Sequence, residues 1–409
     1  MPCRKFYLHP QVLKRRKLFD MIFRTDKILP SPFNEMLENY NLAKDKMPND
    51  FNSKHWDVFP SDYEKTILST NSWKNFLRNS ISIGYNDELM DLENTRWNKD
   101  KNNIDVWALR KNHDHRILSA SVGDVKKLTD TFNLISSICT LDFVLSSIAS
   151  NNGMPVTGKA VLKTKEVSVN LKTGEKLEIV KESNIITSLT DLMHIYYFWQ
   201  ISRTIDTLKE NLRPTICEIG SGYGLLASKL KKKYPHSRCI LFDLPELSAV
   251  QTYYLNTEFP DAKVFYYRDL LDKGSSIFDL DFDFLILPGW MMDSVPEKYI
   301  DVVINMRSMM EMKQKTIQYY FENIHRIVKE GGIFANFNRY VKDVSGELAS
   351  GEISTLKLYP YDDYWSILIS QSSILQNNIH DLITKREDVK MDLTVSEALK
   401  SLPPFNVKQ

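Results

Sequence analysis

The chain has 409 residues, of which 43% are hydrophobic and 26% charged, and its formal net charge is +1. This length predicts two or three domains, and the composition is that of a soluble globular protein. A net charge so close to zero gives no reason to expect nucleic acid or an anionic membrane as a partner. No apolar run of about 18 residues predicts a membrane span, and basic residues interrupt the N-terminus where a signal peptide needs an apolar core.

Four cysteines are scattered along the chain without a C-x-x-C pair. This spacing argues against a zinc site or a disulfide framework and fits a reducing compartment. We therefore expect a cytoplasmic protein.

Residues 1–155 read as a mostly helical N-terminal domain without assignable chemistry. Its clearest helical pattern is the apolar periodicity from Leu128 to Ile148. His113 and His115 could form a metal dyad, but a polar stretch without a third ligand favours a solvated loop. Val161 to Ile179 alternates on both sides of a turn at Lys172 to Glu175, which predicts a β-hairpin linker over residues 156–185.

Ile216 to Gly224 holds three glycines at every second position, directly after an apolar run. Strand, glycine turn and helix form the opening unit of a doubly wound α/β sheet, where the backbone approaches a ligand. The dinucleotide fingerprint is G-x-G-x-x-G, whereas this turn reads E-x-G-x-G-x-G. A pyrophosphate would disfavour the carboxylate of Glu218, whereas the cationic methionine end of S-adenosylmethionine would favour it. An ordinary tight turn in another α/β domain is the alternative.

Arg238 to Phe242 is the second predicted strand, and it ends at Asp243. Residues just past the carboxyl end of a parallel strand face the ligand crevice. A carboxylate there can accept hydrogen bonds from both hydroxyls of a ribose, because it has two acceptor oxygens. The sequence therefore predicts Asp243 as a ribose ligand.

The later strands follow in chain order with one ambiguity, because two apolar runs compete for the third strand. Gly331 and Gly332 are expected to stop the helix before the fifth strand, and the stretch after the sixth strand reads as helical and loosely constrained. The expected elements are a third strand at Lys263–Tyr267 or Phe282–Pro288, a fourth at Ile300–Ile304, a helix at Gln314–Val328, a fifth strand at Ile333–Phe337 and a sixth at Ser366–Ser370.

Five βα-like units, with Glu218 and Asp243 in place, resemble a class I S-adenosylmethionine-dependent methyltransferase over roughly residues 186–385, leaving 386–409 as a tail. The match sharpens in the polar segment from Asn305 to Met312, at Asn338 and Arg339, and in the aromatic segment before Trp365. Together these segments resemble the sugar O-methyltransferase family of bacterial surface-polysaccharide gene clusters.

The resemblance implies a Rossmann-like doubly wound sheet, S-adenosyl-L-methionine as methyl donor and the hydroxyl of a sugar, nucleotide sugar or glycan as acceptor. Three residues would bind the acceptor, namely Ser308, Asn338 and Arg339. The cofactor would be bound by Glu218, Gly220, Ser221, Gly222, Gly224, Asp243, Leu244 and Asn305.

Methyl transfer is an in-line displacement, in which the protein mainly aligns donor and acceptor. A sugar hydroxyl is a poor nucleophile, so a general base would help by roughly 10²–10⁴-fold. Glu311, just past the fourth strand, is the candidate base, with a helix-capping carboxylate as the alternative. His194 is the second candidate, with a satisfied helix histidine as the alternative. No tight carboxylate or histidine cluster stands out, so we expect metal independence.

Three rival functions remain. A nucleotide-sugar oxidoreductase would show G-x-G-x-x-G and would lack Glu218. A small-molecule methyltransferase of another acceptor class, such as an N-methyltransferase, would typically carry Asn/Asp-Pro-Pro-Tyr where this chain has Asn305 to Ser308. A non-catalytic methyltransferase-like binding protein would be expected to lose the cofactor glycines, and all three are present. The sequence leaves the oligomeric state open.

Overall fold

The computed structural model describes residues 30–48, 51, 122–148, 158–169, 176–187, 189–207, 213–343 and 353–403. His113, His115 and much of the expected N-terminal domain lie outside this part. The strands are β1 (Gly158–Val169), β2 (Lys176–Thr187), β3 (Thr215–Ile219), β4 (Arg238–Asp243), β5 (Val264–Tyr266), β6 (Phe284–Pro288), β7 (Ile300–Met306), β8 (Val328–Arg339), β9 (Val341–Asp343), β10 (Ile353–Thr355), β11 (Trp365–Ser372) and β12 (Ile379–Arg386). The α-helices are α2 (Pro30–Asp45), α9 (Val122–Cys139), α10 (Leu141–Ser147), α11 (Leu189–Thr207), α12 (Leu225–Lys233), α13 (Pro245–Glu258), α14 (Tyr267–Lys273), α15 (Gln314–Ile327) and α16 (Val395–Ser401).

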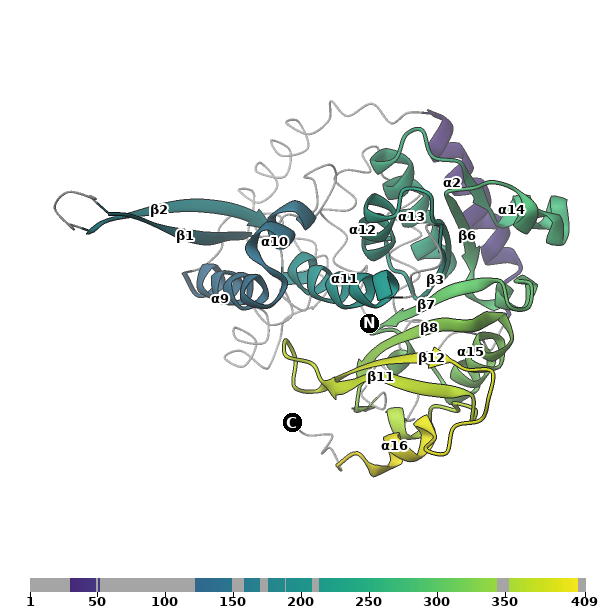
Figure 1. The fold of residues 1–409 in the computed structure, drawn as a ribbon. Coiled ribbons are helices and arrows are strands. Elements are labelled where there is room, and N and C mark those ends of the chain that lie inside the picture. Colours follow the sequence, from purple (N-terminus) through teal and green to yellow (C-terminus); the bar gives the residue numbers. More distant parts are fainter. Residues whose placement is uncertain are drawn as a thin grey trace, which may run out of the picture.

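An eight-stranded sheet in the order β11-β12-β8-β7-β3-β4-β6-β5 forms the centre of the fold (Figure 1). The strands from β8 to β5 run parallel, and β12 and β11 close one edge as an antiparallel pair. The chain moves outward from β3 through β4, then returns to place β7 on the other side of β3. This reversal is a topological switch point, where doubly wound sheets bind their ligands.

Helices cover both faces of the sheet, and each face has its own hydrophobic core. The side chains of Ile216, Leu241 and Ile304 pack with α11, α12 and α13 on one face. Those of Cys217, Ile240 and Val303 pack with α15 and α16 on the other. Consecutive strand residues are buried on opposite faces, which is why these strands read as unbroken apolar runs. The predicted mixed α/β doubly wound sheet is confirmed.

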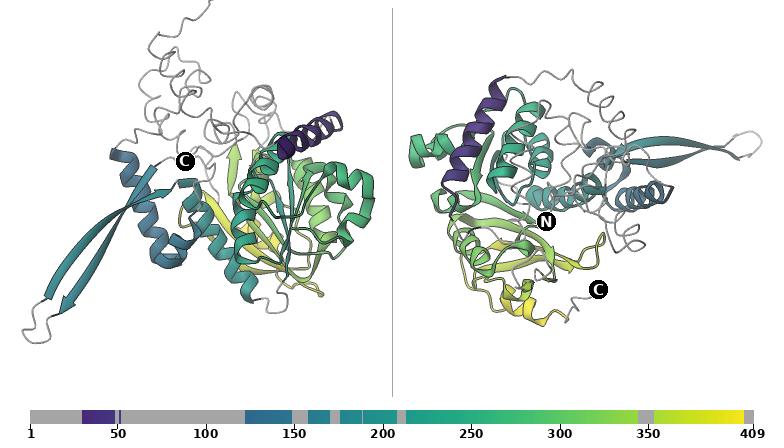
Figure 2. Two further views of the ribbon diagram at one scale, coloured as in Figure 1. Left: turned by 90° about the horizontal axis from the view of Figure 1, so that it is seen from above. Right: turned by 180° about the vertical axis from the view of Figure 1, so that it is seen from behind.

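The elements before β3 confirm the predicted helical segment and β-hairpin. α9 and α10 cover the apolar stretch from Leu128, and β1 pairs antiparallel with β2 from Gly158↔Thr187 to Val169↔Lys176. The hairpin projects away from the sheet, with α9 against its base (Figures 1 and 2). No single helix in the described ranges is long and apolar enough to cross a membrane, although the bent pair of α9 and α10 passes that test by length and composition.

Both candidates for the third strand are strands, because β5 and β6 lie side by side at the sheet edge. The expectation that Gly331 and Gly332 stop a helix is wrong, since α15 ends at Ile327 and both glycines lie within β8. Between the pairs Ile300↔Val328 and Val302↔Ile333 the register shifts, and Gly331 has a φ of 80° there. The positive φ that a glycine allows at a helix end here serves an irregularity in the pairing of β7 with β8.

The expectation of a helical, loosely constrained C-terminal stretch is wrong in part, because a strand precedes its helix. β12 is a strand of this stretch, and it inserts between β8 and β11 with six buried residues in succession. α16 follows, and its Val395 and Leu399 are buried in the same core as α15. Paired backbone and apolar packing therefore hold this region to the sheet.

Candidate active site

The glycine turn lies at the switch point, between the ends of β3 and β7. Gly220, Gly222 and Gly224 have φ values of 67°, 56° and 94°. L-residues with a Cβ rarely adopt this region. At Gly220 a Cβ would also lie 2.0 Å from the Ser308 Oγ, so the turn after β3 and the segment after β7 need a glycine to approach one another.

Asp243 closes the turn from the neighbouring strand. Its Oδ2 accepts the N–H of Gly222 at 2.7 Å, and its Oδ1 accepts the N–H of Leu244 at 2.7 Å. Each carboxylate oxygen has a second lone pair, so the group can still accept two donors such as ribose hydroxyls. Burial raises the pKa of Asp243 to about 7, and the two N–H donors oppose that rise.

Glu218 lies one strand away, with 2% of its surface exposed. Among the described residues its Oε2 has no hydrogen-bond partner. Burial, followed by the charge of Asp243, raises the pKa of Glu218 to about 8, against a hydrogen bond from the backbone of Ala227. A buried carboxylate with an unsatisfied oxygen is costly unless a donor or cation binds it. This is the chemistry of a site for a cationic group.

Gln251 on α13 is a further residue of the turn that the sequence did not indicate. Its amide nitrogen donates to the Ser221 Oγ at 2.8 Å and to the Gly222 carbonyl at 2.6 Å. Gln251 therefore fixes Ser221, one of the predicted cofactor ligands. A glutamine in a helix carries no local signal for this role, because the contact depends on how α13 packs over the turn.

The predicted polar residues after β7 and β8 form a buried hydrogen-bond network. The Asn305 amide donates to the Ile219 carbonyl at 2.9 Å and to the Ser308 Oγ at 2.6 Å. Asn338 donates to the Asn305 Oδ1 at 2.8 Å and accepts the N–H of Met310 at 3.1 Å. These bonds fix the short helical turn Met309–Glu311 against the end of β3.

Asn305 and Asn338 are fully buried in this network. The Ser308 Oγ also donates to the Ile219 carbonyl at 3.1 Å. The structure thus brings the predicted residues together, but it places the amides of Asn305 and Asn338 within the protein rather than at a surface.

Glu311 and Arg339 are both half-buried. Glu311 follows β7 and Arg339 is the last residue of β8, so both lie at the carboxyl ends of parallel strands. The Glu311 charge contributes to the raised pKa of Asp243, so both carboxylates act on the same region. Arg307 lies shortly before Glu311 in the chain. Its φ is 60°, and its backbone N–H donates a hydrogen bond to the Phe337 carbonyl at 2.8 Å. Non-glycine residues in this region of φ cluster at functional sites.

His194 is buried on α11, and its Nδ1 lies 2.7 Å from the Thr190 carbonyl. Burial lowers the pKa of His194 to about 4, so the imidazole is neutral at physiological pH. The charges of Lys229, Asp191 and Arg307 also act on it. The neutral imidazole can accept a proton, but a pKa of about 4 makes it a weak base at physiological pH.

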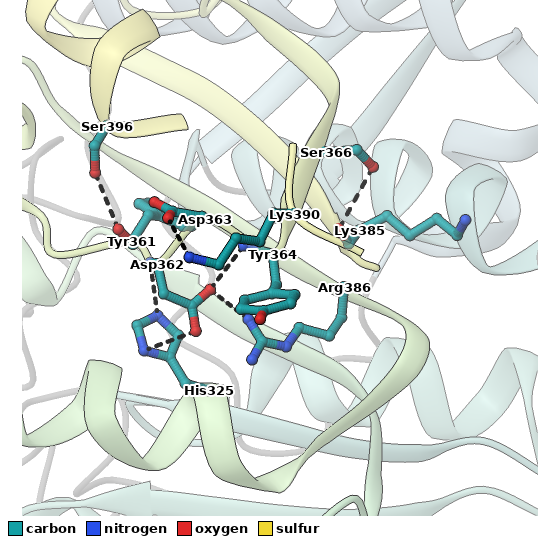
Figure 3. Close-up of polar contacts among 10 residues, drawn as sticks. All are labelled: His325, Tyr361, Asp362, Asp363, Tyr364, Ser366, Lys385, Arg386, Lys390 and Ser396. Carbon is teal, nitrogen blue, oxygen red and sulfur yellow. Dashed lines mark hydrogen bonds and ion pairs between the residues drawn. The ribbon is translucent and has the colours of Figure 1, made fainter. Parts of the chain in front are cut away.

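Two other histidines form contacts beside the C-terminal strands. His325 lies in the last turn of α15, where its Nδ1 is 3.6 Å from Asp362 and its Nε2 accepts the Asp362 N–H at 3.4 Å (Figure 3). Arg386 pairs with the same carboxylate. This cluster lies where β8 begins, at the end of the sheet opposite the glycine turn, so His325 has a structural role.

His380 lies on β12, with its ring nitrogens 3.0 Å from the hydroxyls of Tyr340 and Ser370. In the part of the chain that the structure describes, no three His, Cys, Asp or Glu side chains gather as a metal site. Metal independence stays a prediction.

Comparisons with known proteins bear on the same region. Residues 187–273 match the family model of the O-methyltransferase domain. Solved structures with similar folds include an O-methyltransferase family protein from Burkholderia thailandensis (13% identity, 48% of this chain, 59% of that protein, TM-score 0.32) and the pyocyanin biosynthetic protein PhzM (13%, 48%, 56%, 0.30). Human N-acetylserotonin methyltransferase, solved in complex with S-adenosylmethionine, is another (15%, 48%, 55%, 0.28).

The chain thus spans a little over half the length of these proteins, and at such TM-scores the likeness carries no further argument. No curated protein matches this chain. The stretch from α11 to α14, which contains the glycine turn, Glu218 and Asp243, is similar to an O-methyltransferase domain.

Proposed function

We propose that this protein is an S-adenosylmethionine-dependent O-methyltransferase that methylates a sugar hydroxyl. One observation carries the proposal: two buried carboxylates, Glu218 and Asp243, flank a glycine turn at the switch point of a doubly wound sheet. The family-model match over residues 187–273 favours oxygen as the acceptor atom. The sugar acceptor and a role in polysaccharide biosynthesis rest on the resemblance of the Asn305 to Met312 segment and of Asn338 and Arg339.

The residues around the turn fit the two ends of the cofactor. Glu218, with its unsatisfied oxygen, would accept the ammonium of the methionine part. Asp243 would accept the ribose hydroxyls with its remaining lone pairs. Without side chains, Gly220, Gly222 and Gly224 would let the cofactor approach the backbone closely. Three further residues, Ser221, Leu244 and Asn305, lie around the same turn. The cofactor supplies an already activated methyl group, so the protein mainly has to align the acceptor.

On the acceptor side, Glu311 is the proposed general base, with His194 as the second candidate. Arg339 would contact the acceptor or an anionic group attached to it. Ser308 and Asn338 support this side indirectly, because their polar groups already bind Ile219, Asn305 and the turn that carries Glu311.

Calorimetric titration of the purified protein with S-adenosylmethionine and, separately, with NADH tests this function. We expect micromolar affinity for S-adenosylmethionine and no NADH signal. Asp243→Asn keeps the size of the side chain but removes its charge, and it should weaken the affinity. Arg238→Lys, at the opposite end of the same strand, is the control. Binding of NADH alone would favour the oxidoreductase, and binding of neither would favour a non-catalytic protein.

A further inference from the structure

α2 and Phe51 lie at the same end of the sheet as the glycine turn, where the parallel strands end. β4 pairs with β6 in a register that places Asp243 beside Pro288. Gly289 and Trp290 directly follow Pro288, so they neighbour the carboxylate proposed to bind the ribose. In a nucleoside the base is bonded to the ribose. If Asp243 binds the ribose, this loop is therefore the part of the protein nearest to the adenine.

Phe51 contacts this loop, although it is distant in the sequence. A Cβ at Gly289 would lie 2.3 Å from the Tyr320 hydroxyl and 2.8 Å from the Phe51 ring, so only a glycine lets both approach. The Phe51 ring lies 5.5 Å from that of Trp290, in an edge-to-face arrangement. The Thr316 hydroxyl also donates to the Phe51 carbonyl at 3.3 Å. Phe51 and Trp290 are both half-buried, which leaves part of each ring for a further contact.

α2 is anchored to the elements that follow β4 and β5. Lys44 forms an ion pair of 2.6 Å with Glu246, in the first turn of α13. The backbone N–H of Arg268 donates to Asn39 at 3.2 Å, and Arg268 also pairs with Glu35 at 3.4 Å. α2 packs along α13 and against α14 (Figure 2).

These contacts lie on the β4 side of the switch point, whereas Glu311 and Arg339 follow β7 and β8 on the other side. We infer that α2 and Phe51 complete the adenosine end of the cofactor site, with Phe51 and Trp290 as an aromatic wall for the adenine. This inference rests on the proposed function. Because coupling between sites is reciprocal, bound cofactor should also strengthen the docking of α2.

Titration of S-adenosylmethionine into the full chain and its variants tests the inference. Phe51→Leu keeps an apolar side chain but removes the ring, and it should raise Kd about 5- to 100-fold, the range of a lost base–aromatic contact. Tyr299→Leu is the matched control, because Tyr299 is also half-buried and packs edge-to-face on Phe278, but at the opposite edge of the sheet. Its Kd should stay within about twofold of wild type.

Two further readouts do not depend on Phe51→Leu. Trp290→Phe should still bind S-adenosylmethionine but lose most of the ligand-induced change in tryptophan emission. Hydrogen exchange of the α2 amides should slow when S-adenosylmethionine is present, and less so in Lys44→Met.

The outcomes separate the two proposals. Absence of binding to the wild-type protein overturns the proposed function and this inference together. Wild-type binding with an unchanged Kd in Phe51→Leu, or with unchanged exchange in α2, overturns the inference alone.

Discussion

At the scale of single residues, the two buried carboxylates differ in what satisfies them. Asp243 receives two backbone N–H groups, whereas Glu218 keeps one oxygen without a partner among the described residues. The sequence predicted both positions, because the end of a strand beside a glycine turn is a local pattern. It did not predict Gln251, whose role depends on helix packing.

The pKa of Glu218 predicts how cofactor affinity depends on pH. Burial holds this pKa at about 8, so below pH 8 the carboxyl is mostly protonated before a cation binds. A cation binds the ionised form, which requires release of the proton. Kd should therefore fall as pH rises from 6 to 8, by at most about tenfold per unit, and level off above 8.

Calorimetry in two buffers of different ionisation enthalpy would measure the released proton directly. Glu218→Gln should bind more weakly, and only the shallower pH dependence that ionisation of Asp243 contributes near its pKa of about 7 should remain. An affinity of the wild-type protein that does not change between pH 6 and 8 would contradict the role of Glu218.

The base assignment predicts a separation between binding and turnover. Glu311→Gln should lower kcat by roughly 10²–10⁴-fold with the sugar acceptor that best supports methyl transfer, because the hydroxyl loses its proton acceptor. The Kd for S-adenosylmethionine should change little. Glu297→Gln, a substitution in the loop before β7, is the control. Full turnover by Glu311→Gln would leave His194 as the candidate.

At the scale of elements, the buried strands could be predicted because both of their faces are covered, which makes their sequences continuously apolar. Helix ends and edge strands were less predictable. Glycines adopt a positive φ both at helix ends and at irregularities within strands, so the sequence around Gly331 did not distinguish these two structures. β12 was missed because His380 and Asp381 interrupt its apolar residues, and both become buried only through their partners on α11, on β11 and at Tyr340, directly after β8.

The glycine turn predicts a steric test with an internal control. Gly220→Ala combines a positive φ with a Cβ 2.0 Å from the Ser308 Oγ, whereas Gly274 has a φ of 57° and nothing within 4 Å of a Cβ. Gly274→Ala should lower the free energy of unfolding by about 1–3 kcal/mol, the cost of a backbone conformation (φ 57°, ψ −148°) that is nearly restricted to glycine. Gly220→Ala should cost more and also weaken S-adenosylmethionine binding. Urea unfolding and calorimetry give both values, and equal costs would exclude the steric argument.

At the scale of the whole molecule, the sequence predicted a doubly wound domain but treated residues 1–155 as a separate unit. The structure shows that parts of this region contact the sheet domain closely, through pairs such as Lys44 with Glu246. Contacts between residues some 200 positions apart leave no periodic signal in either segment. The acceptor side was partly predictable for a related reason: Asn305, Ser308 and Asn338 were recognised, but only packing shows that two of them are buried.

The ion pair between Lys229 and Asp191 joins these parts of the molecule. Both side chains are almost fully buried, and their charged groups lie 2.7 Å apart between α12 and α11. Lys229 also donates to the Ser147 carbonyl of α10 at 2.5 Å. Lys229→Met should lower the free energy of unfolding by about 3–5 kcal/mol, because it leaves the buried carboxylate without its cation. Lys229→Met combined with Asp191→Leu removes both charges and should recover much of that loss. Urea unfolding of the wild type, both single variants and the double variant measures this coupling, and additive losses would show that the pair does not hold α10, α11 and α12 together.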